Sequence, residues 1–177
     1  MFNRLSVPEL TRAIPEKAFR VADSQVASRW GNITEFKGFD LITPNEREAR
    51  FAMADQDSTV GRLASLLKES SEYRNLILKL GDRGIFCTSD DPSAKDSYFS
   101  VDSFANNVVD AVGAGDALLA YATLTLMANG SLVMASILGS MAAACECEID
   151  GNVPIKSENV LAKIDALEKL AGYNTPN

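Results

Sequence analysis

Short apolar runs recur along the first part of the chain and end at glycines or polar turns. Runs of this length and composition are typical of strands in a buried sheet. The pattern predicts strands at Phe19–Ala22, Phe39–Ile42, Asn75–Leu80, Gly84–Thr88 and Tyr98–Val101, with a polar turn at Ser89–Asp96 between the last two.

Helical spacing of apolar residues fills the stretches between and after these strands. It predicts helices at Asn45–Ala54, Thr59–Lys68, Ala117–Ala128, Leu132–Cys147 and Ser157–Leu170. Strands that alternate with helices indicate an α/β fold with a largely parallel sheet. The 177 residues fit one domain of ordinary size, so we expect a single α/β domain over residues 1–177.

The first predicted helix carries a start signal. Thr43 is a good N-cap residue, Pro44 suits the first helical position, and Glu46 completes a capping box with Thr43. We therefore expect the helix to begin directly after Thr43.

Composition narrows the classes of partner. The formal net charge is −7, and an acidic surface repels phosphate backbones and anionic lipids, so neither nucleic acid nor a membrane surface is expected. The apolar run at 117–128 is too short to span a bilayer. No signal peptide is recognised, and three cysteines without a Cys-x-x-Cys pair favour reduced thiols, so we expect a cytoplasmic protein.

The chain contains no histidine. This absence excludes Ser-His-Asp and Cys-His nucleophiles and histidine-ligated zinc. A proton acceptor that works near neutral pH is then expected to be a carboxylate.

The segment Asp110-Ala-Val-Gly-Ala-Gly-Asp116 runs directly into an apolar helix. Gly113 and Gly115 allow backbone amides to approach an anion without a Cβ in the way. The start of the helix adds free N–H groups and the positive end of its dipole. Asp116 would lie in the first turn, where it could accept a proton from an attacking hydroxyl, or simply complement the dipole.

This segment and the Ala-Leu-Leu-Ala that follows closely resemble the C-terminal signature of ribokinase-like (PfkB) carbohydrate kinases. The resemblance implies that Asp116 is the catalytic base and that Gly113, Ala114 and Gly115 form the anion hole. It also implies a Rossmann-like three-layer sandwich. Ala111 stands where the family usually has threonine, which removes a hydroxyl but not the loop geometry.

Two further motifs agree with this family in order and spacing. Asn45 and Glu48 match its Pro-Asn-x-x-Glu motif, which implies that they organise Mg²⁺ and phosphates through water. Lys79, Gly81 and Gly84 match its Thr-x-Gly-x-x-Gly turn near the phosphates and ribose of ATP, with Lys79 in place of threonine. Lys79 either contacts phosphate or faces solvent.

Weaker features follow from the same resemblance. The helix around Ala144 and the loop Gly151–Pro154 correspond to the place where relatives enclose adenine. Asp110 and nearby carbonyls correspond to the monovalent cation site of some relatives. The phrase Ala22–Gln25 is similar to that of kinases related to the heptose-phosphate kinases.

The resemblance begins near the middle of a family chain and continues to its end. The N-terminal half, with its Gly-Gly substrate motif, several strands and a β lid over the sugar, is not recognisable in this sequence. Because a sheet without those strands exposes an edge, we expect a homo-oligomer or a missing N-terminal half as partner.

The expected activity is transfer of the γ-phosphoryl group of ATP to a hydroxyl of a sugar or sugar phosphate. Two alternatives stay open on the sequence. The chain could be a non-catalytic nucleotide-binding module without a sugar site, or an assembly half that needs its complement to fold.

Overall fold

The computed structural model describes residues 7–23, 32–90 and 98–172. The chain divides into two compact units, Met1–Ser100 and Val101–Asn177, and each unit is described by itself. The α/β fold class is confirmed, whereas the single domain over residues 1–177 stays a prediction.

The first unit contains the sheet. Its strands are β1 (Val21–Ala22), β2 (Leu41–Ile42), β3 (Asn75–Lys79), β4 (Ile85–Ser89) and β5 (Tyr98–Val101), and they lie in the order β1-β2-β3-β4-β5. β1 pairs with β2 and β2 with β3 in parallel, whereas β3 and β4 are antiparallel. The carboxyl ends of β1, β2 and β3 therefore share one edge.

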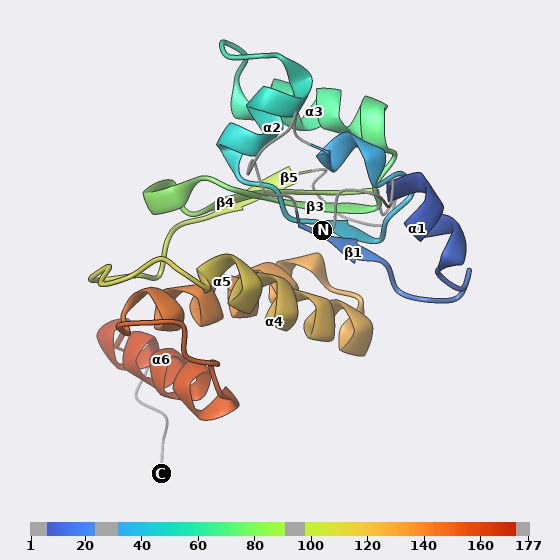
Figure 1. Cartoon of the computed structure of the whole chain (residues 1–177). Helices are drawn as coiled ribbons and strands as arrows, with labels where there is room; N and C mark the ends of the chain where they lie inside the picture. Colours follow the sequence, from blue (N-terminus) through green and yellow to red (C-terminus); the bar gives the residue numbers. More distant parts are fainter. Residues whose placement is uncertain (1–6, 24–31, 91–97, 173–177) are drawn as a thin grey trace. The chain divides into compact units, whose positions relative to one another are not determined.

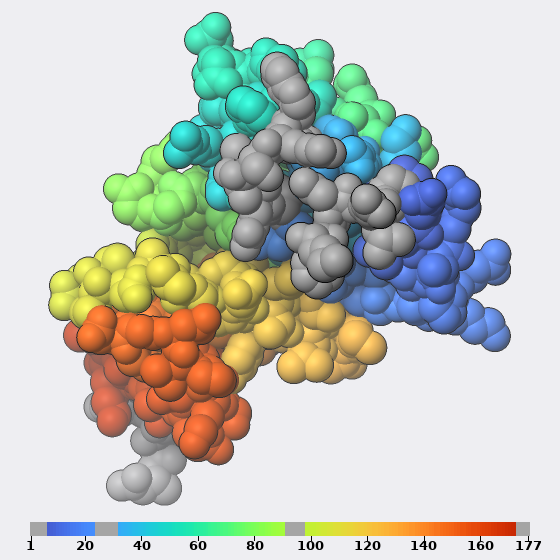
Figure 2. All heavy atoms as spheres, in the orientation of Figure 1, coloured from blue at the N-terminus to red at the C-terminus, as the bar shows by residue number. Residues whose placement is uncertain are grey.

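Two helices cover one face of this sheet, α2 (Glu46–Met53) and α3 (Val60–Ser71) (Figure 1). Their apolar sides meet strands β2 and β3 in a core that includes Ile42, Leu63 and Leu76, all fully buried. In Figure 2 the atoms of α2 and α3 lie together at the top of the view. The first unit also has α1 (Val7–Ala13) and the short 3-10 helices η1 (Ile33–Glu35) and η2 (Gly81–Arg83).

The predicted start of α2 is wrong by two residues. Thr43 continues the sheet, since its amide donates to the Ala22 carbonyl at 2.9 Å, and its side chain is fully buried. Asn45 is the N-cap instead and forms the capping box with Glu48. Pairing between strands thus decides where the helix begins.

Other boundaries differ by a few residues. β1 and β2 are shorter than predicted, since only two residues of each pair in the ladder. Helix α1 was not predicted at all. Ser89 of the predicted polar turn belongs to β4, and residues 91–96 of that turn lie outside the described residues.

The second unit contains three helices, α4 (Ala114–Asn129), α5 (Leu132–Cys147) and α6 (Ser157–Leu170) (Figure 1). α4 and α5 approach closely at Gly139, where an added Cβ would lie 3.0 Å from the Leu118 carbonyl oxygen. α6 packs against α5 through Val160, Met141 and Ala142. No helix in the described part of the chain is long and apolar enough to cross a membrane.

Candidate phosphate-handling site

The signature turn of the second unit is built around Gly113. This residue caps α4 with φ 87°, a left-handed conformation that favours glycine. An added Cβ would lie 2.6 Å from Glu146 Oε1 and 2.7 Å from Asn152 Oδ1. The conformation therefore favours glycine here, and any larger residue would force the side chains of Glu146 and Asn152 to move.

The turn presents backbone amides at the start of α4. Asp110 Oδ1 accepts a 3.0 Å hydrogen bond from the Val112 amide, and the Gly113 carbonyl accepts from the Ala117 amide at 2.9 Å. The amides of Gly115 and Asp116 lie in the first turn, where helical N–H groups have no acceptor within the helix. They can therefore bind an anion.

Asp116 lies in that first turn and is exposed. Its carboxylate is near the positive end of the α4 dipole. The placement suits an acceptor for a proton from solvent-accessible substrate.

The C-terminal end of α5 holds the segment that leads into the turn. The Cys147 carbonyl accepts hydrogen bonds from the amides of Val109 (2.7 Å) and Asp110 (3.2 Å). Glu148 Oε1 accepts from the Asn106 amide at 3.0 Å. Two successive residues of one helix end thus fix this segment.

Glu146, the residue before Cys147 in α5, is buried and lies against the Gly113 turn. Its side chain is only 2% exposed, and Oε1 accepts from the Val153 amide at 3.1 Å. It therefore holds the loop after α5 beside Gly113. Neither Glu146 nor Glu148 was predicted as a site residue. The sequence signal for them is a pair of carboxylates at the C-terminal end of an apolar helix, where the helix dipole disfavours negative charge.

Lys163 of α6 completes this support. Its Nζ donates to Glu148 Oε1 at 2.8 Å, and only 9% of the Lys163 side chain is exposed. Burial raises the pKa of Glu148, but hydrogen bonds from Lys163 and the Asn106 amide, with the Lys163 charge, bring that pKa below its ordinary value. Glu148 is therefore a carboxylate held in its charged form.

In the first unit, Asn45 and Glu48 form a reciprocal pair. Asn45 Oδ1 accepts from the Glu48 amide, and Glu48 Oε2 accepts from the Asn45 amide, both at 2.8 Å. Oxygen donors are what Mg²⁺ prefers, so the residue types fit this ion. Because each side chain already accepts an amide, the pair is better suited to hold Mg²⁺ through water than by direct ligation.

Lys79 is the last residue of β3 and lies at the edge of the sheet formed by the carboxyl ends of β1, β2 and β3. Its amide donates to the Pro44 carbonyl at 2.9 Å, which places it beside Asn45. Its Nζ lies 2.7 Å from Asp23 Oδ2, so the side chain is held by an ion pair rather than free in solvent, and contact with phosphate stays a prediction. Gly81 and Gly84 both have positive φ, and η2 forms the predicted turn between them.

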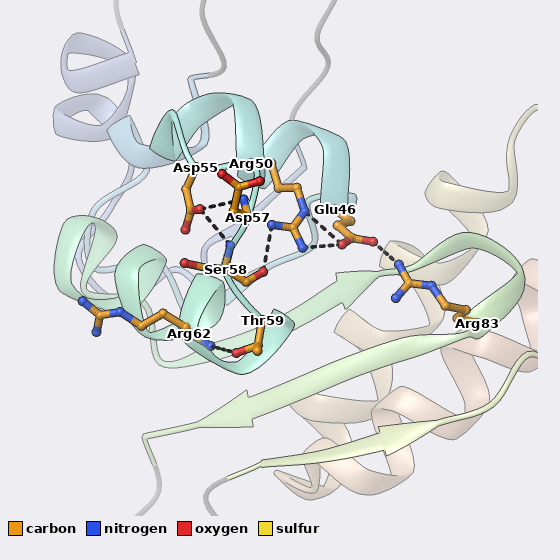
Figure 3. A network of polar contacts seen from close by, with 8 residues as sticks. All are labelled: Glu46, Arg50, Asp55, Asp57, Ser58, Thr59, Arg62 and Arg83. Atoms are coloured by element: carbon orange, nitrogen blue, oxygen red, sulfur yellow. Dashed lines mark hydrogen bonds and ion pairs between the residues drawn. The ribbon is translucent and has the colours of Figure 1, made fainter.

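A polar network connects α2 to this turn (Figure 3). Arg50 donates to Glu46 Oε1 at 2.7 and 3.0 Å and to the Ser58 carbonyl at 3.0 Å, and Arg83 of η2 pairs with Glu46 Oε2. Burial raises the pKa of Glu46, but the hydrogen bonds and charges of Arg50 and Arg83 hold that pKa below its ordinary value. Glu46 thus joins the start of α2 to η2.

A depression of about 490 Å³ opens beside this network. Asn45, Arg47, Lys79 and Gly81 are among the residues that line it. Of the first-unit residues predicted from the two motifs, Asn45, Lys79 and Gly81 therefore line one hollow, whereas Glu48 and Gly84 are not among its lining residues.

Residues 9–154 match the family described as pfkB family carbohydrate kinase. The chain belongs to this family. The match includes all three motifs, and it confirms the family expected from the sequence.

Relatives of the pfkB chain agree with this assignment. This chain is 27% identical over 166 residues to "Bifunctional protein HldE" of Desulfatibacillum aliphaticivorans. The match covers 88% of this chain and 32% of that protein. The match to the protein of the same name from Geobacter metallireducens is 25% identical and likewise covers 32% of that protein. The chain thus spans about a third of the length of these curated relatives.

Solved structures confirm the ribokinase-like fold of this pfkB chain. Ribokinase from Thermotoga maritima matches with a TM-score of 0.67 and 25% identity, covering 82% of this chain and 48% of that one. Phosphofructokinase-2 from Escherichia coli, in complex with substrates and products, matches with a TM-score of 0.75 and 19% identity, covering 93% of this chain and 54% of that one.

The predicted site residues of the pfkB chain fall into two groups, one in each unit. The second-unit group adjoins the signature turn, apart from Ala144, which is only 3% exposed within α5. Among the described residues, no cluster of three or more acidic or cysteine side chains could hold a metal directly. The individual roles of the site residues stay predictions.

Proposed function

We propose that this chain carries the nucleotide-handling residues of an ATP-dependent phosphotransferase that acts on a hydroxyl of a sugar or sugar phosphate. The observation that carries the proposal is the Gly113 turn. There, free amides and the exposed carboxylate of Asp116 share the first turn of α4, and the buried side chain of Glu146 occupies the space that a Cβ would need. Membership of a carbohydrate kinase family supports the reaction class.

In the proposed reaction, Asp116 accepts the proton of the substrate hydroxyl as its oxygen bonds to the γ-phosphorus. The bond from that phosphorus to the bridging oxygen of ADP breaks, and ADP leaves with the electron pair. The amides from Gly113 to Asp116 stabilise the negative charge on the transferred phosphoryl oxygens. Positioning and electrostatics of this kind supply most of the catalysis in phosphoryl transfer.

The first unit supplies residues for the phosphates of ATP. When bound, Mg²⁺ neutralises charge on the phosphate oxygens, and Asn45 and Glu48 would hold it through water. Lys79 and the turn at Gly81 and Gly84 would contact the phosphates and ribose.

Three further assignments complete the proposal. Ala144 would lie near adenine, and Asp110 would take part in binding a monovalent cation; a potassium complex of phosphofructokinase-2 is among the similar structures. The protein would act in the cytoplasm. The phrase Ala22–Gln25, of which Ser24 and Gln25 lie outside the described residues, makes heptose phosphates a first choice of acceptor.

Calorimetric titration of MgATP into the purified chain, followed by ADP release with a panel of sugars and sugar phosphates, tests the proposal. Asp116→Asn removes the proton acceptor but keeps the shape, so nucleotide affinity should change by less than about threefold. Turnover should fall by about 100-fold or more, as for loss of a general base. Equal turnover in wild type and variant would contradict the role of Asp116.

A second candidate is a non-catalytic nucleotide-binding module. Such a module would share every motif described above. Such a module would bind MgATP but release no ADP with any acceptor. The same panel therefore separates the two functions.

A further inference from the structure

Lys79 and Asp23 form an ion pair at one edge of the sheet. Nζ and Oδ2 are 2.7 Å apart, and the two side chains are only 19% and 22% exposed. Asp23 follows β1 and Lys79 ends β3, so the pair joins the carboxyl ends of two strands that both run parallel to β2. Ligands of open α/β sheets bind at this edge.

Other cations near the depression are differently placed. Arg50 and Arg83 are both held by Glu46, and Arg47 is an exposed residue at the start of α2. Lys79 and Arg50 are comparably buried and both line this hollow, but Arg50 pairs with Glu46 one turn away in the same helix, whereas the charge of Lys79 is balanced by Asp23 from the end of another strand.

We infer that Asp23 is a competing counter-ion, which an incoming polyphosphate must displace from Lys79. The inference rests on the proposed nucleotide function and adds a specificity device to it. A phosphate that reaches Lys79 with Asp23 in place meets a carboxylate close by, and charges at partly buried positions are poorly screened. A polyphosphate chain can offset that repulsion by also contacting other donors of the hollow, such as Arg47, whereas a small single anion cannot reach them at once, so the pair selects for a polyphosphate chain.

The test uses inorganic tripolyphosphate as the probe, because it carries the phosphates of ATP without the base or ribose. Asp23→Asn keeps the shape and an oxygen acceptor but removes the competing charge. We expect tripolyphosphate to bind this variant about tenfold more tightly than wild type, and orthophosphate to gain proportionally more. In calorimetry a tenfold gain corresponds to about 1.4 kcal/mol.

The double variant tests the mechanism. Lys79→Gln should weaken tripolyphosphate binding, and Asp23→Asn should then give no further gain, because the cation it competes for is gone. Asp82→Asn removes the same charge from an exposed position in η2 and should change affinity by less than about threefold. Arg47→Gln removes a cation from the same hollow and should show no coupling to Asp23.

A second measurement needs no variant. Acetylation of Lys79 in the wild-type chain, followed by mass spectrometry, should slow when tripolyphosphate is present, because phosphate replaces Asp23 on Nζ. The inference is overturned if Asp23→Asn leaves tripolyphosphate affinity unchanged or weaker, or if wild type binds none. A chain that passes this test but transfers no phosphoryl group would instead contradict the proposed function alone.

Discussion

At the scale of single residues, Gly113 and Gly130 illustrate two different reasons for a glycine, backbone conformation and lack of space for a Cβ. Both have positive φ and both flank α4. An added Cβ meets nothing within 4 Å at Gly130, but meets Glu146 and Asn152 at Gly113. Gly130 thus serves backbone conformation alone, whereas Gly113 also lets the turn lie against a buried carboxylate.

This contrast gives a matched pair of variants. Gly130→Ala should cost about 1 kcal/mol of unfolding free energy, the price of a left-handed conformation for an L-residue. Gly113→Ala should cost about 1–3 kcal/mol more, because Glu146 and Asn152 must also move. Chemical denaturation of the two variants measures the difference, and equal losses would show that the contact with Glu146 imposes no constraint.

At the scale of elements, the end of α5 acts as a support for the loop before α4. Glu148 receives the Asn106 amide and the ammonium group of Lys163, and the neighbouring Cys147 carbonyl receives the amides of Val109 and Asp110. This support offsets the cost of placing carboxylates at the negative end of a helix dipole.

The lowered pKa of Glu148 predicts a pH dependence. A carboxylate whose pKa is depressed on folding stabilises the fold fully above its unfolded value of 4.5, and this contribution disappears as the pH falls through the folded value. Glu148→Gln should therefore be less stable than wild type by about 1–2 kcal/mol at pH 7, from loss of charge-assisted hydrogen bonds.

The difference between wild type and Glu148→Gln should shrink as the pH is lowered below 4.5, because wild type then loses the same charge. Denaturation curves at a series of pH values measure it. Lys163→Met provides a second route to the same loss of stability. A gap that persists at the lowest pH would mean that shape, rather than charge, is what Glu148 contributes.

At the scale of the whole molecule, β1 is the end strand of the sheet among the strands that the structure describes. The Arg20 carbonyl accepts from the amides of Asp40 and Leu41, and the Ala22 carbonyl accepts from the Thr43 amide, so the backbone groups of Val21 between them point to the opposite side. An outward row of this kind is a template for pairing with another chain. We therefore propose that the chain self-associates through β1 when no complementary half covers it.

Val21→Pro removes the outward N–H but leaves the bonds from β1 to β2, since proline is tolerated at an edge position of this kind. Sedimentation should show an oligomer for wild type and a monomer for the variant. Val21→Thr keeps the N–H and should associate like wild type. A monomeric wild type at all concentrations would count against association through this edge.

The sequence by itself determined the features that depend on near neighbours. The bounds of β5, α5 and α6 agree with the predicted ranges. Turn residues mark the ends of those stretches, and the apolar spacing within them identifies the type of element. The turn of Gly113 at the start of an apolar helix and the exposed Asp116 in its first turn were also predictable, since a few consecutive residues dictate such a turn.

Only the tertiary structure decided which distant groups meet. Pairing of β1 with β2 extended the sheet to Thr43 and moved the cap of α2 to Asn45. Asp23 and Lys79 are 56 residues apart in the chain, and Glu146 lies beside Gly113 only because α5 returns to the start of α4. No local pattern specifies such contacts, since they follow from how strands and helices pack.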